Sequence, residues 1–146
     1  MTTSATGGCL CGSVRYEADG AARAQTLCHC LSCRRAAGAA SVAWVVFGAD
    51  GFRFTAGAPA TFASSPEVTR GFCRVCGTSL TYQHAARPGA IDVTTATLDD
   101  ADAFAPTKEI WIADKLAWAT LDPTIDHYAQ SSVGAQPITE RRRCRL

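Results

Sequence analysis

Seven of the eight cysteines in this 146-residue chain are gathered in three short clusters. The clusters are Cys9/Cys11, Cys28/Cys30/Cys33 and Cys73/Cys76. Thiols crowded this closely cannot all pair with one another, but they can converge on a metal ion. Zinc takes four ligands in a tetrahedron, and two cysteines separated by one or two residues can chelate one ion. The spacing therefore predicts metal binding.

The number of clustered thiols predicts two sites of different kinds. Seven is too many for one four-thiolate site and one too few for two. A closed site of four leaves three thiolates, and three protein ligands with an open fourth position are typical of catalytic zinc. The candidates for the open site are Cys28, Cys30 and Cys33. The closed site then takes Cys9, Cys11, Cys73 and Cys76.

Spacing alone leaves one alternative open. A conventional zinc ribbon would use Cys30/Cys33 with Cys73/Cys76, although its loop of about forty residues is longer than the usual fifteen to twenty. His29 lies between two of the clustered thiols, and we expect its side chain to point away from their metal and to be solvated or hydrogen-bonded.

The elements that position these thiols are predicted to be mainly β-strands. Alternation of apolar and polar residues, or enrichment in β-branched and aromatic residues, predicts strands. They cover residues 12–18, 42–47, 52–54, 79–82, 90–98 and 110–112. One or two helical turns are expected over 34–40, where Gly38 weakens the helix. Short strands with frequent turns favour a mainly antiparallel β domain.

Composition fits a single globular domain. Hydrophobic residues make up 47% of the chain and charged residues 18%, and the net charge of +1 gives no reason to expect nucleic acid or an anionic membrane as partner. We expect a flexible leader over 1–7, a zinc-binding β domain over 8–130 and a basic tail over 131–146. Neither a membrane-spanning run nor a signal peptide is apparent, which predicts a cytoplasmic protein with reduced thiols.

Three motifs in the same order resemble the glutathione-dependent formaldehyde-activating enzyme (Gfa) family, which includes centromere protein V. They are Gly8–Tyr16, Cys28–Arg34 and Phe72–Thr78. The resemblance runs from about residue 7 to 128 and implies a β-tent fold of antiparallel sheets. It implies a structural zinc on Cys9, Cys11, Cys73 and Cys76, and a second, labile zinc on Cys28, Cys30 and Cys33. Two zinc ions per chain are therefore expected.

The activity that this resemblance implies is the condensation of formaldehyde with glutathione to S-hydroxymethylglutathione, a carbon–sulfur lyase reaction in reverse. The partners would be a glutathione-like thiol and a small aldehyde. Three thiolates make a weak Lewis acid of the metal, so a metal-activated substrate thiolate is favoured over zinc hydroxide. A nearby donor must then stabilise the alkoxide that forms.

Two arginines and one departure from the family bear on the substrate. Arg34 and Arg35 follow the triplet and could bind the carboxylates of a glutathione-like substrate, or else be solvated charges that offset the thiolates. Many relatives carry a histidine where this chain has Glu109, which would change the reaction or substrate if that histidine acts on it. A thiol carrier without turnover and a zinc scaffold domain remain the alternative functions.

Overall fold

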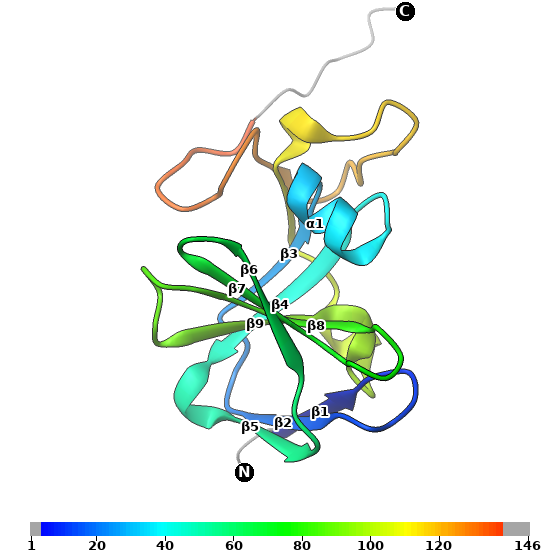
Figure 1. The fold of residues 1–146 in the computed structure, drawn as a ribbon. Helices are drawn as coiled ribbons and strands as arrows, with labels where there is room; N and C mark the ends of the chain where they lie inside the picture. The colour runs from blue at the N-terminus through cyan, green and yellow to red at the C-terminus, as the bar shows by residue number, and fades with distance from the viewer. Residues whose placement is uncertain (1–3, 139–146) are drawn as a thin grey trace, which may run out of the picture.

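The structure, a computed structural model, describes residues 4–138 as two β-sheets with one α-helix (Figure 1). The smaller sheet has the strand order β1-β2-β5 and is antiparallel throughout. Its strands are β1 (Ser4–Gly8), β2 (Arg15–Asp19) and β5 (Phe52–Ala56). In Figure 1 this sheet lies at the bottom, and the helix α1 (Leu31–Ala37) lies near the top.

The larger sheet has eight strands in the order β11-β10-β3-β4-β9-β8-β7-β6. In that order they are β11 (Asp126–His127), β10 (Lys108–Ile110), β3 (Ala24–Cys28), β4 (Val42–Gly48), β9 (Ala90–Thr94), β8 (Ser79–His84), β7 (Val68–Phe72) and β6 (Ala60–Ser65). Only β10 makes parallel pairs, with β3 and β11, among these described strands. Short 3-10 turns complete the fold: η1 (Ala49–Gly51), η2 (Thr95–Thr97), η3 (Ala101–Phe104) and η4 (Ile112–Asp114). The prediction of a mainly β, largely antiparallel domain with short helical turns is confirmed.

Part of the expected leader over 1–7 lies in a strand, while its residues 1–3 fall outside the described residues. Residues 4–8 form β1, which pairs with β2 from Ser4 opposite Asp19 to Gly8 opposite Arg15. The small residues of this segment allow close packing. A side chain at Gly7 would collide with the ring and hydroxyl of Tyr16. The absence of a side chain at this position therefore serves the fold.

The long strand expected over 90–98 is also corrected. β9 ends at Thr94, and residues 95–97 turn out of the sheet as η2. Hydroxyl groups explain the change, because the Thr97 hydroxyl donates to the Thr94 carbonyl at 2.8 Å. Such local side-chain bonds to the backbone compete with strand pairing, which β-branched composition alone does not reveal.

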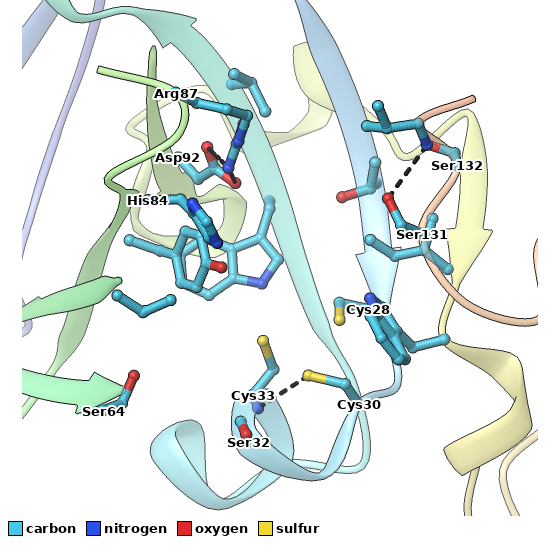
Figure 2. A pocket seen from close by; sticks show the side chains of 18 of the residues that line it. Cys28, Cys30, Ser32, Cys33, Ser64, His84, Arg87, Asp92, Ser131 and Ser132 are labelled. Atoms are coloured by element: carbon cyan, nitrogen blue, oxygen red, sulfur yellow. Dashed lines mark hydrogen bonds and ion pairs between the residues drawn. The ribbon is translucent and has the colours of Figure 1, made fainter. Parts of the chain in front are cut away.

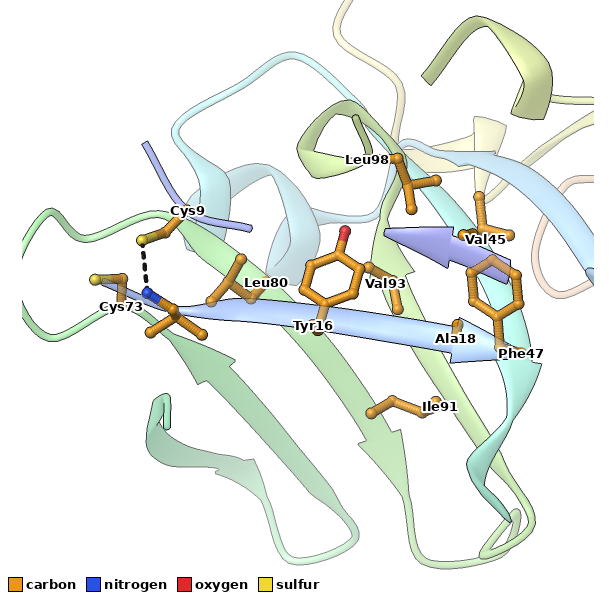
Figure 3. Packing of buried hydrophobic residues seen from close by; sticks show 12 residues of the cluster. Cys9, Tyr16, Ala18, Val45, Phe47, Cys73, Leu80, Ile91, Val93 and Leu98 are labelled. Carbon is orange, nitrogen blue, oxygen red and sulfur yellow. Dashed lines mark hydrogen bonds between the residues drawn. The ribbon is translucent and has the colours of Figure 1, made fainter. Parts of the chain in front are cut away.

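β4 separates the hydrophobic core from the thiol-bearing face of the larger sheet. Successive side chains of a strand point to opposite faces. Val45 and Phe47 are fully buried in the main core with Tyr16 of β2 (Figure 3). Val42 and Trp44 pack instead in a second cluster that contains Cys28 and Cys33. One strand thus anchors the core on one side and supports a site on the other.

Tyr16 provides a test of this core. Its side chain is fully buried, its hydroxyl lies 2.7 Å from that of Thr97, and burial raises the pKa of Tyr16 to about 12. The folded protein therefore retains this proton to higher pH than the unfolded chain. The resulting contribution to stability is fully present below pH 10 and is lost as the pH rises through about 12.

We predict that Tyr16→Phe lowers the free energy of unfolding by about 1 kcal/mol at pH 7, because the hydrogen bond between the Tyr16 and Thr97 hydroxyls is lost. The variant should also lose less stability than the wild type between pH 9 and 11. Urea unfolding of both proteins at pH 7, 9 and 11 measures both effects. Parallel stability losses in the two proteins at alkaline pH would contradict the assignment to Tyr16.

Candidate metal centre

Four thiols from two distant loops meet at one point. Cys9 and Cys11 lie between β1 and β2, and Cys73 and Cys76 lie between β7 and β8; we call them the four-thiol cluster. All four sulfurs lie within 4.8 Å of one another. Cys11 Sγ is 3.6 Å from Cys9 Sγ and 3.8 Å from Cys73 Sγ. Sulfurs about 2.3 Å from one tetrahedral zinc lie about 3.8 Å apart, so the cluster has the dimensions of a metal site.

Each loop turns so that backbone amides face the sulfurs. Gly12 and Gly77, which follow the second cysteine of each pair, have φ of 78° and 80°, in the left-handed region that glycine favours. The amide of Cys76 donates to Cys73 Sγ at 3.5 Å. The Thr78 hydroxyl, 3.2 Å from Cys76 Sγ, is the main cause that lowers the pKa of Cys76 to about 5. The loop therefore already favours the thiolate of Cys76.

The remaining three thiols form a separate, local group, which we call the three-thiol cluster. Cys28 ends β3, Cys30 caps the N-terminus of α1, and Cys33 lies in the first turn of that helix. The helix begins earlier than the expected 34–40, because Cys30 Sγ accepts the amide of Cys33 at 3.3 Å. The three sulfurs lie within 4.8 Å of one another, and no fourth Cys, His, Asp or Glu of residues 4–138 joins them.

The charge of this cluster is unevenly distributed. Hydrogen bonding with Cys28 and Cys33 lowers the pKa of Cys30, and hydrogen bonding with Cys30 raises the pKa of Cys28. One thiolate accepting from two neighbouring thiols explains both directions. Three thiolates could coexist here only with a cation between them, which a divalent metal would provide.

A cavity of about 660 Å³ opens beside the three-thiol cluster (Figure 2). Trp44, Tyr82 and Trp111 provide aromatic walls. Figure 2 shows Arg87 and Asp92 at the opposite end of the cavity from Cys30 and Cys33. The cavity thus places thiols at one end and a pair of opposite charges at the other, since the guanidinium of Arg87 lies 3.2 Å from the Asp92 carboxylate.

The arginines of the cavity differ from those singled out in the sequence. Arg34 and Arg35 do not line it; Arg34 donates to the carbonyls of His29 and Asp114, and Arg35 is exposed. Arg70 of β7 and Arg87, which follows β8, line it instead. Their sequence neighbourhood gives little signal, because it is the pairing of β7, β8 and β9 in the sheet that brings them to the cavity.

His29 points away from the sulfurs toward a buried carboxylate. His29 Nε2 lies 2.5 Å from Glu109 Oε2, and the side chains are only 1% and 0% exposed. The second carboxylate oxygen of Glu109 accepts the amide of Asp122 at 2.6 Å. Glu109 does not line the cavity. In this structure Glu109 therefore braces the backbone between Cys28 and Cys30 and contacts no substrate space.

The family model of the glutathione-dependent formaldehyde-activating enzyme matches residues 4–114, well over half of the chain. The chain belongs to this family. The match includes β1 and both thiol clusters, and it ends before the C-terminal boundary that the sequence motifs suggested.

One solved relative supports the fold. The crystal structure of a Rhodobacter sphaeroides protein matches with a TM-score of 0.55 and 24% identity, covering 65% of this chain and 88% of that one. At this identity the likeness shows the fold alone. No curated protein matches significantly. In the part of the chain that the structure describes, no helix is long and apolar enough to cross a membrane.

Family membership and geometry agree at a coarse level. The family is associated with glutathione-dependent activation of formaldehyde, and the chain has two cysteine clusters that could hold metal. The sulfurs are divided into the four and three that the sequence suggested, and not into the alternative ribbon set. The ligand role of each cysteine stays a prediction.

The buried pair of Glu109 and His29 generates a stability prediction. Glu109→Ala leaves His29 and the Asp122 amide without their partner, and losing one partner of a buried pair costs about 3–5 kcal/mol. Glu67→Ala is the control, because Glu67 forms an exposed pair with His84 that is worth at most about 1 kcal/mol. Urea unfolding at a fixed zinc concentration measures both; equal losses would contradict the bracing role.

Proposed function

We propose that this protein is a zinc-dependent carbon–sulfur lyase that joins a glutathione-like thiol to formaldehyde or another small aldehyde. The observation that carries the proposal is the position of the three-thiol cluster, which lacks a fourth ligand among residues 4–138 and borders a cavity of about 660 Å³. That volume is within the range of small-molecule sites. The four-thiol cluster is proposed to hold a second, structural zinc.

The residues around the cavity suit such a substrate. When bound at the three-thiol cluster, zinc would supply a position that lowers the pKa of a thiol. Trp44, Tyr82 and Trp111 provide aromatic walls beside that position. Arg87 and Asp92 offer opposite charges at the far end, which complement the carboxylate and ammonium groups of glutathione.

The reaction balances without a further reactant. A new bond joins the substrate sulfur to the aldehyde carbon as the C=O π bond opens. The proton that leaves the thiol ends on the new hydroxyl oxygen. The reverse reaction breaks the carbon–sulfur bond and returns thiol and aldehyde. The three cysteines act as zinc ligands. Their role is to keep the positive charge of the metal beside the reacting thiol.

The deciding variant is Cys28→Ser/Cys30→Ser/Cys33→Ser. We expect about two zinc ions per wild-type chain and about one in the variant, because each cluster can hold one ion. The variant should retain its fold, since the four-thiol cluster is untouched, and should form S-hydroxymethylglutathione at the uncatalysed rate. Elemental analysis, circular dichroism and a glutathione–formaldehyde assay measure these outcomes.

The Cys144→Ser variant is the control, because it changes the one cysteine outside the clusters. It should match the wild type in zinc content and rate. The wild-type protein could instead bind glutathione saturably without altering the condensation rate. That result would contradict the proposed enzyme and favour a thiol carrier. Loss of both zinc ions and of the fold in the triple variant would show that the three-thiol cluster is structural.

A further inference from the structure

A buried arginine lies against the three-thiol cluster. Arg70 of β7 is 8% exposed, and its two terminal nitrogens lie 3.7 and 3.8 Å from Cys33 Sγ. Its Nε donates to the Ser64 hydroxyl at 3.1 Å, and its guanidinium lies 5.1 Å above the centre of the Tyr82 ring. Neighbouring strands β6 and β8 thus hold the guanidinium beside the sulfurs, where it also lines the cavity.

Arg70 has no carboxylate partner within residues 4–138, whereas Arg15, Arg53 and Arg87 each pair with an acidic side chain. A buried cation is costly unless it is paired and hydrogen-bonded. The Ser64 hydroxyl and the Tyr82 ring carry no formal charge. The negative charge that compensates Arg70 is therefore that of the thiol cluster itself.

The sum of charges has a consequence for the ligand. Three thiolates and one divalent cation carry a net charge of about −1. A fourth, anionic ligand would make the net charge about −2. The cavity has largely apolar walls, where like charges repel strongly. With Arg70 included, the same assembly carries about −1. A neutral ligand gains no comparable benefit from the guanidinium.

We propose that Arg70 is a positioning residue that makes the three-thiol cluster selective for thiols bound as thiolates over neutral ligands. This inference rests on the proposed function for the location of the substrate thiol, but it concerns binding and not turnover. Arginine carries five guanidinium N–H donors, so Ser64 and Cys33 do not use all of those of Arg70.

The test compares an anionic and a neutral ligand on cobalt-loaded protein. 2-Mercaptoethanol is the thiol probe, because it has no carboxylate for other arginines to bind, and imidazole is the neutral probe. Sulfur-to-cobalt charge-transfer absorption and cobalt d–d bands report each titration without any reaction. We expect Arg70→Gln to weaken thiol binding at least about tenfold and to change imidazole binding by less than about twofold.

Two further variants make the result specific. Arg70→Lys retains the charge and should keep thiol binding within about threefold. Arg74→Gln is the matched control, because it removes one exposed arginine from the loop of the other cluster and should change neither ligand. Equal weakening of thiol and imidazole by Arg70→Gln, or none, would overturn the proposal.

If Arg70→Gln does not fold, Arg70→Lys decides. Retained preference for the thiol supports a role of charge, and lost preference refutes it. The outcome is separable from that of the proposed function. A protein that binds thiolates through Arg70 without accelerating the condensation refutes only the enzyme, and an active Arg70→Gln variant with wild-type thiol binding refutes only the role of Arg70.

Discussion

The convergence of Cys9 and Cys11 with Cys73 and Cys76 is the contact on which the rest of the architecture depends. It joins the loop between β1 and β2 of the smaller sheet to the loop between β7 and β8 of the larger one. The hydrophobic core lies between these sheets, with Tyr16 from one and Val45, Leu80 and Val93 from the other. Because this cluster closes a long loop of chain, metal bound there would stabilise the packing of both sheets.

The three-thiol cluster differs in kind because it is local. Cys28, Cys30 and Cys33 come from one strand end and the helix that follows it, so their approach needs no distant pairing. Pairing between strands that are distant in sequence provides the residues that surround these three thiols. β10 brings Glu109 beneath His29, and β7 brings Arg70 to Cys33. The local segment thus provides the ligands, and the sheet provides the charges around them.

This division explains how much could be predicted. The thiol clusters, the buried strand β4 and the mainly β class follow from short-range patterns of residue type and spacing. Arg34 and Arg35 follow the triplet directly in sequence, but neither lines the cavity, and Arg34 donates to the His29 and Asp114 carbonyls. Arg70 and Asp92 reach the cavity only through the register of an eight-stranded sheet. No local signal in the sequence encodes that register.

Glu109 is a residue for which the sequence suggested a role at the substrate and the structure shows a different position. The resemblance to the family marked Glu109 as a departure from the histidine expected there and suggested a change of reaction or substrate. The structure places its carboxylate fully buried between His29 and the Asp122 amide, outside the cavity. Glu109 uses both of its carboxylate oxygens here, whereas a neutral histidine offers one acceptor nitrogen and one donor. Glu109 therefore holds the backbone between two of the thiols, and the residues that face the cavity are left to determine the ligand.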